Sequence, residues 1–140
     1  MALLLLLLGA CTGPVRSTSV YESKAGATAE TVASAVETAR LAAQAARDGD
    51  AYGRYLTQLL ADAEKDADAA QGTFEGIQPP DRRADQLRDQ LDELLGQATD
   101  TLADLRIAAR RGRFTELAEP AGRPAGRLAE ELHAFAEAHA

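Results

Sequence analysis

The sequence predicts an all-α protein folded as an antiparallel four-helix bundle with up-down-up-down topology. Apolar and small residues recur at alternating steps of three and four over long stretches, which is the period of a helix with one buried face. No stretch shows the strict apolar–polar alternation that is typical of a half-buried strand. Short connections containing Gly or Pro separate the stretches, so successive helices run antiparallel and bury their apolar stripes against one another.

The first two helices are predicted from about Ala25 to Gly49 and from Asp50 to between Gly72 and Gly76. Gly49 suits a left-handed C-cap, and Asp50 suits the N-cap of the second helix. The predicted stripes are Ala25, Ala29, Val32, Val36, Ala39, Ala43 and Ala46, then Tyr52, Leu56, Leu59, Ala63, Ala67, Ala70 and Phe74. Because most of these side chains are short and aromatic residues are few, we expect close packing, a small dry core and no roomy ligand pocket.

The third helix is predicted to begin at the two prolines that precede Asp81. Pro79 and Pro80 suit a first helical turn, and Asp81 adds negative charge at the positive end of the helix dipole. Gly112 should end this helix. Its stripe is rich in leucine and comprises Ala84, Leu87, Leu91, Leu94, Ala98, Leu102, Leu105 and Ala109.

The last segment keeps a helical register but contains four helix-breaking residues. The register positions are Phe114, Leu117, Ala121, Ala125, Leu128, Leu132 and Phe135. Pro120, Gly122, Pro124 and Gly126 lie among them, and an interior proline removes a backbone hydrogen bond and clashes with the preceding turn. We therefore predict a fourth helix that is kinked or broken near Pro120 to Pro124.

The N-terminus carries an apolar run that ends in the only cysteine, Cys11. The run is too short for a transmembrane helix, which needs about 20 residues, but it suits the apolar part of a signal peptide. Leu8, Gly9, Ala10 and Cys11 resemble the lipobox of bacterial lipoproteins. The resemblance implies that residues 1–10 are removed and that Cys11 carries lipid, such as palmitate, at the extracytoplasmic face of the cell membrane.

Two features qualify this interpretation of the N-terminus. Signal peptides normally open with Lys or Arg, whereas only Met1 and Ala2 precede the leucines, so we expect the true start to lie upstream. The alternative interpretation is an apolar, helix-forming terminus in which Cys11 is a free thiol. A lone cysteine cannot form an intramolecular disulfide, which fits lipid attachment better.

The rest of the chain is predicted to be one domain on a tether. Residues 11–24 begin rich in Gly, Pro, Ser and Thr and show no sustained apolar period, so we predict a flexible tether followed by a bundle over residues 25–140. The formal net charge of -7 makes nucleic acid a poor partner. The stretch from Phe74 to Pro80, the Leu-rich helix and Ala108 to Gly112 are also similar to small helical secreted lipoproteins of high-GC bacteria, which mostly have no assigned activity.

The best chemical candidate is the Glu-x-x-His pair formed by Glu130 and His133. Di-iron bundle proteins use two such pairs and two further inward carboxylates, whereas this chain has one pair, and Glu130 should face water. The acidic residues within 62–68 and 81–93 match no calcium loop and are interpreted as a solvated face. The two histidines near the C-terminus provide little basis for a hydrolase triad, so we expect no metal, no cofactor and no enzymatic activity.

The predicted function is that of a membrane-anchored, exported lipoprotein that binds or scaffolds at the cell envelope. Its expected partners are membrane lipid, through the covalent anchor, and an envelope protein. Tyr52 and Tyr55 are interpreted as core or interface residues at the end of the bundle. The alternative is a ligand- or metal-binding bundle that uses Glu130, His133 and Glu137.

Overall fold

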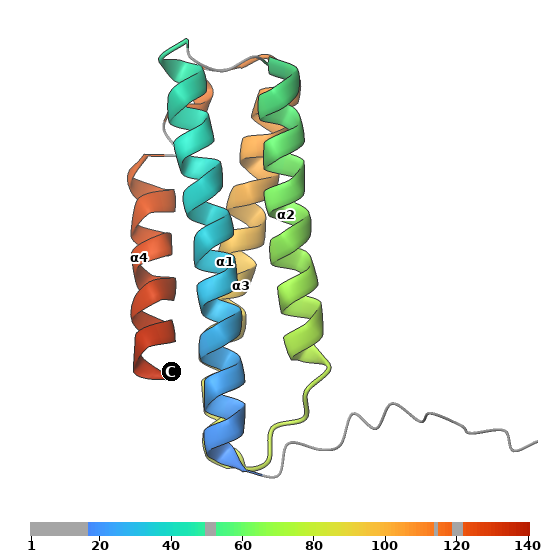
Figure 1. Cartoon of the computed structure of the whole chain (residues 1–140), viewed down its shortest axis with the longest axis vertical. Helices are drawn as coiled ribbons and strands as arrows, with labels where there is room; N and C mark the ends of the chain where they lie inside the picture. Colours follow the sequence, from blue (N-terminus) through green and yellow to red (C-terminus); the bar gives the residue numbers. More distant parts are fainter. Residues whose placement is uncertain (1–16, 50–52, 114, 119–121) are drawn as a thin grey trace, which may run out of the picture.

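A computed structural model of the chain describes residues 17–49, 53–113, 115–118 and 122–140. Regular structure in these ranges is entirely helical and comprises α1 (Thr18–Arg47), α2 (Gly53–Glu75), α3 (Arg82–Arg110), the short 3₁₀ helix η1 (Glu116–Ala118) and α4 (Arg123–Ala138). Successive α-helices run in opposite directions (Figure 1), which confirms the predicted antiparallel four-helix bundle. In the described part of the chain, no helix combines the length and apolar composition that a membrane span requires.

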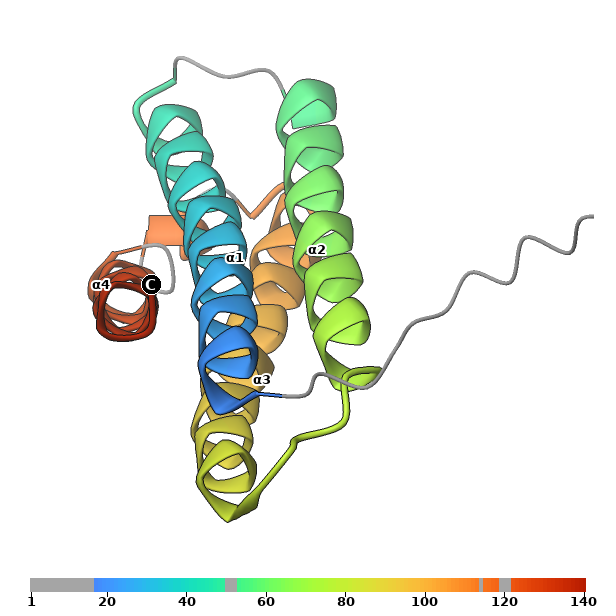
Figure 2. The same cartoon turned by 60° about the horizontal axis from the view of Figure 1, so that its bottom comes forward.

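Helix α1 is the centre of the bundle. It contacts α2, α3 and α4, whereas α2 and α4 do not contact each other. Helix α4 is seen nearly end-on in Figure 2 while the other three are seen more from the side, so α4 crosses the bundle at an angle. Because three helices cover α1, residues outside its predicted stripe are buried too, namely Tyr21, Gly26, Ala33, Ala35 and Ala42. The prediction of one buried stripe on α1 was too narrow, because three neighbours cover more of a helix than one does.

The predicted tether is wrong for residues 18–24, which form the first turns of α1. Ser17 is the N-cap, and its hydroxyl accepts a hydrogen bond from the Val20 amide at 3.3 Å. Tyr21 is fully buried and packs on Phe74 with 5.3 Å between the ring centroids. It lies one turn before Ala25 and so extends the buried face toward the N-terminus. Residues 11–16 of the predicted tether lie outside the described residues.

Helix α3 starts one residue after Asp81, which is the N-cap rather than a first-turn residue. Its carboxylate accepts a hydrogen bond from the Ala84 amide at 2.9 Å, so Pro79 and Pro80 precede the cap and are not in the first turn as predicted. The Thr18 hydroxyl also donates to this carboxylate. The hydrogen bond from Thr18 is the largest cause of a lowered pKa at Asp81, and the hydrogen bond from the Ala84 amide is the second largest. Asp81 therefore joins the starts of α1 and α3.

The predicted registers of α2 and α3 are mostly confirmed, with one shifted leucine in each helix. Leu60 and Leu95 are fully buried, whereas the predicted Leu59 and Leu94 are only partly buried. Both helices pack against more than one neighbour, so the buried face is wider than a single row. The predicted glycine ends of α1 and α3 are confirmed, since Gly49 and Gly112 have φ values of 86° and 67°.

The predicted break before the last helix is confirmed. Helix η1 brings Leu117 into the core, and α4 begins afterwards at Arg123. Pro124 lies in the first turn of α4, where a missing amide proton breaks no intrahelical hydrogen bond. The buried face of α4 comprises Ala125, Leu128, Ala129, Leu132 and Ala136. Phe114 and Ala121 of the predicted register, and the predicted helix breaker Pro120, lie outside the described residues.

A glycine allows the backbones of α1 and α4 to approach closely. A Cβ atom added at Gly26 would lie 2.8 Å from the carbonyl oxygen of His139 and 3.2 Å from that of Ala136. Backbone atoms cannot rotate away as the end of a flexible side chain can. Gly26 therefore sets the separation between α1 and the end of α4.

We expect Gly26→Ala to destabilise the docking of α4, because the added methyl group overlaps backbone. Gly72→Ala in α2 is the matched control, since an added Cβ there meets no atom within 4 Å. The control should stabilise the protein by up to about 1 kcal/mol through helix propensity alone. Thermal unfolding and hydrogen exchange of α4 amides measure both variants, and a Gly26→Ala protein as stable as Gly72→Ala would contradict the close approach.

We expect Leu91→Asp to unfold the domain. Leu91 is fully buried, and an unpaired carboxylate in such a site costs several kcal/mol, which is comparable to the stability of a typical domain. Asp89→Ala changes an exposed residue of the same helix and should leave the circular dichroism and melting temperature nearly unchanged. A Leu91→Asp protein that melted like the parent would show that α3 is packed through another face.

Candidate functional site

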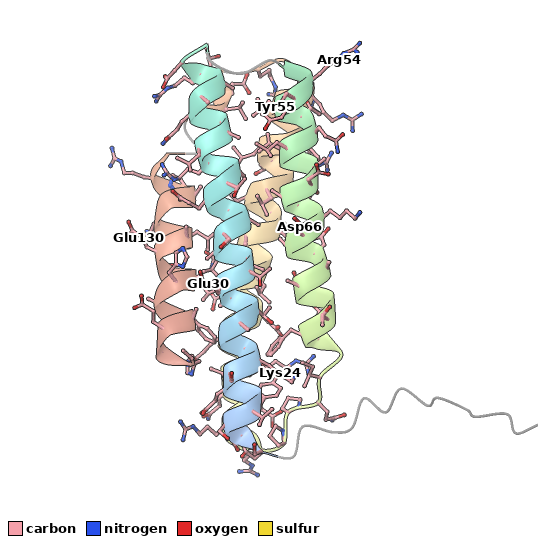
Figure 3. The ribbon with its side chains drawn as sticks, viewed as in Figure 1. Lys24, Glu30, Arg54, Tyr55, Asp66 and Glu130 are labelled. Carbon is pink, nitrogen blue, oxygen red and sulfur yellow. The ribbon has the colours of Figure 1, made fainter. Side chains whose placement is uncertain are left out.

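The predicted Glu130–His133 pair does not form a shared site. His133 Nδ1 lies 2.9 Å from Glu30 Oε2, so the histidine of α4 pairs with a carboxylate of α1. Glu130 is exposed and lies on the outer side of α4, away from Glu30 (Figure 3). The histidine thus contributes a polar contact between α1 and α4 rather than a ligand set with Glu130.

No other predicted site residue completes a metal centre in the part of the chain that the structure describes. Glu137 is exposed, and within the described ranges no group of three or more His, Cys, Asp or Glu side chains is placed to hold a metal ion. The His139 ring packs against that of Phe135 in a tilted arrangement, with 4.5 Å between the ring centroids. The lipobox residues Leu8, Gly9, Ala10 and Cys11 lie outside the described residues.

The acidic residues that the sequence groups together divide into two kinds. Some stabilise the bundle. Glu64 of α2 forms a bidentate ion pair with Arg106 of α3, in which Arg106 Nη2 donates to Glu64 Oε1 at 3.1 Å and Arg106 Nε donates to Oε2. Others are exposed, and no cation among the described residues forms an ion pair with Asp62, Asp66 or Asp68. The predicted solvated face is therefore confirmed for these three aspartates and wrong for Glu64.

A polar cluster that was not predicted lies at the base of the bundle, the end where α1 and α3 begin and α2 ends. We call it the Tyr21–Asp92 cluster. The Tyr21 hydroxyl and Asp92 Oδ1 are both buried without a hydrogen-bond partner. Arg88 lies beside them, with its Nε 3.6 Å from Asp92 Oδ2, and its Nη2 donates to the backbone oxygen of Glu75 at 2.8 Å.

Desolvation controls the protonation of this cluster. Burial raises the pKa of Asp92, and the charge of Arg88 opposes that shift. Burial likewise raises the pKa of Tyr21. Two buried polar atoms without partners reduce stability, and an ionised Asp92 adds a charge that its surroundings disfavour. The arrangement offers no activated nucleophile or base, and the Asp92 side chain as a whole is 39% exposed, so we interpret the cluster as a structural feature at the edge of the core.

The raised pKa of Asp92 predicts a specific loss of stability with pH. Because the folded-state pKa exceeds the unfolded value of about 4, the folded state binds more protons between the two pKa values, and the free energy of unfolding falls as pH rises through that window. Asp92→Asn should remove this fall and raise the melting temperature at pH 7. Asp89→Asn makes the same change of charge at an exposed site. If Asp92→Asn were less stable than Asp89→Asn at pH 7, pairing with Arg88 would outweigh desolvation.

An open groove lies between α1 and α2, and we call it the α1–α2 groove. It encloses about 770 Å³, and short side chains make up much of its lining, among them Ala27, Thr31, Ser34, Ala35, Ala63 and Ala70. The groove is open to solvent, so the expectation that the chain lacks a roomy ligand pocket stays a prediction. Alanine packs helices closely in the core, but on this face alanine and threonine are too short to fill the space between the two helices.

The threonine hydroxyl groups in the α1–α2 groove are hydrogen-bonded to their own helices. Four threonines donate to the backbone oxygen four residues earlier: Thr28 to Lys24 at 3.0 Å, Thr31 to Ala27 at 2.9 Å, Thr38 to Ser34 at 2.8 Å and Thr73 to Ala69 at 2.7 Å. Their protons are used within the helix, so the groove offers few free donors to a ligand. Its charged lining residues are Lys24, Asp62 and Asp66.

Figure 3 shows two labelled lining residues of this groove, Lys24 near the base and Asp66 midway, and it shows Tyr55 on α2 toward the opposite end of the bundle. Tyr55 is 67% exposed, so it is not a core residue, and its predicted role at an interface stays a prediction. Tyr52 lies outside the described residues. Small and polar residues recur on the α1 side of the groove, but such residues are common on solvated helices and do not by themselves indicate a groove.

Comparison with known proteins adds no family to these features. No protein family model, curated protein or solved structure matches the chain. The α1–α2 groove, the Tyr21–Asp92 cluster and the Glu30–His133 pair therefore rest on the geometry given above.

Proposed function

We propose that the protein is an exported lipoprotein, held at the extracytoplasmic face of the cell membrane through lipid on Cys11, whose helical bundle binds an envelope protein. The observation that supports the anchor is the sequence Leu8-Gly9-Ala10-Cys11 at the end of a leucine run. An N-capped helix begins shortly afterwards at Thr18, so the anchor and the bundle are separated by a short segment.

The chemistry of lipid attachment is sufficient to hold such a domain at a membrane. Each buried methylene group contributes about 0.8 kcal/mol, and two or more acyl chains anchor stably where one chain binds only reversibly. The short segment between Cys11 and Thr18 would keep the base of the bundle near the lipid headgroups. The sides of the bundle would then remain accessible to other proteins.

A binding role is supported by the contrast between the α1–α2 groove and the rest of the described surface. The groove is open, lined by short side chains and poor in free hydrogen-bond donors, which suits contact with another apolar surface. The alternative of a metal site around Glu130, His133 and Glu137 has less support, because His133 already pairs with Glu30. We therefore favour protein binding over metal binding or catalysis.

Replacing Cys11 with Ser should release the protein from the membrane fraction, because serine removes the thiol to which the lipid would attach. Thr12→Ser is the matched control and should stay with the membrane. Fractionation and intact-mass measurement of the parent protein provide the readouts. Membrane retention of the Cys11→Ser protein, or a parent mass equal to that of the unmodified chain from Met1 to Ala140, would refute the anchor.

A further inference from the structure

We propose that the α1–α2 groove binds a basic amphipathic helix of a partner protein. This inference deepens the proposed function, on which it rests for the existence of a partner at the envelope. It concerns the groove itself and does not depend on Cys11, so the two proposals can fail separately.

Exposed hydrophobic residues continue the groove toward both ends. Val20, Leu41 and Tyr55 are the large apolar side chains that the described surface leaves exposed, at 49%, 53% and 67%. Val20 and Leu41 share a row of α1 with groove residues Ala27 and Ser34, because the four positions lie seven residues apart, which is about two helical turns.

The same relation holds on α2. Tyr55, Asp62 and Ala69 lie seven residues apart, and the last two line the groove. The exposed hydrophobic residues of the described surface are thus gathered on one face rather than scattered. A gathered apolar face marks an interaction surface, whereas single exposed residues do not.

The shape of this face suits a helix. The groove runs along α1 from Lys24 to Thr38, which corresponds to about 21 Å at 1.5 Å per residue, or about four turns of a bound helix. Short side chains on both walls let a third helix approach closely, with its larger side chains entering the groove. The threonine hydroxyls that bond to their own helices require no polar partner from that helix.

The charges of the groove favour a basic helix. Asp62 and Asp66 lie one turn apart on α2 and are exposed, and no described cation forms an ion pair with either. Two Lys or Arg residues four positions apart on a bound helix would face them at the same spacing. Lys24, toward the base, is the one cation among the groove's lining residues.

A second copy of the chain fits these charges less well. The chain carries a formal net charge of -7, and its own groove presents two carboxylates against one ammonium group. Pairing two copies through this face would bring together surfaces with the same excess of negative charge, which opposes association. We therefore assign the groove to a partner of opposite charge.

The test uses the full chain, purified in detergent micelles, and a labelled 15-residue amphipathic helical peptide of Ala, Leu and Lys with two lysines four positions apart beside its apolar face. The comparison peptide has Glu in place of Lys. Fluorescence anisotropy gives the Kd of each peptide. We expect the Lys peptide to bind and the Glu peptide to bind at least about tenfold more weakly.

Two variants locate the binding on the protein. The double variant Asp62→Lys, Asp66→Lys should weaken binding of the Lys peptide at least about tenfold and strengthen binding of the Glu peptide. Asp100→Lys with Asp104→Lys makes the same change of net charge at exposed positions of α3 and should leave both Kd values within about twofold. Thr31→Trp fills the groove without changing its charge and should also weaken binding of the Lys peptide. Circular dichroism checks the fold of every variant.

Several results would overturn the proposal. These are the absence of binding by the Lys peptide, equal loss of binding in the α3 control, unchanged binding in Thr31→Trp, or a dimer of the full chain in sedimentation that Thr31→Trp dissociates. The last result would assign the groove to a second copy. None of them bears on membrane release of the Cys11→Ser protein, which tests the anchor alone.

Discussion

The bundle depends on the burial of α1 by three helices at once. Short side chains let three helices approach α1 closely, and the buried positions of α1 are mostly alanine, with Gly26 where the end of α4 packs against it. Leucines of α3 and α4 supply the volume that α1 does not. The short side chains of α1 thus allow both the close approach of the helix backbones and the insertion of large side chains from the neighbouring helices.

Polar contacts then fix how the helices sit on this apolar core. The base is defined by the Asp81 cap, which also accepts a hydrogen bond from Thr18, and by the ion pair of Arg83 with Glu22 at 2.9 Å. Ion pairs between partly exposed residues contribute little to stability individually. Their role here is to specify the relative positions of helices whose alanine-rich faces would otherwise allow sliding.

The sequence predicts the helices well because burial has a period that can be read directly. It predicts helix boundaries less well, because a boundary depends on which side chain caps the first turn and not on the apolar period. Ser17 starts α1 earlier than the apolar period indicated, and Asp81 caps α3 after the two prolines. The candidate sites were least predictable. The Glu30–His133 contact joins residues that are far apart in the sequence, and the α1–α2 groove arises from unfilled space between two helices, which no spacing within one helix reveals.

The peripheral place of α4 has a consequence for how cooperatively the protein unfolds. Helix α4 contacts α1 and α3 but not α2, so its detachment would leave the interfaces among α1, α2 and α3 intact, whereas loss of α1 would leave only those of α3 with α2 and α4. We therefore expect α4 to be able to open as a unit separate from α1, α2 and α3. In such a three-helix species the alanine-rich flank of α1 would be accessible to solvent. The α1–α2 groove would be intact in that species.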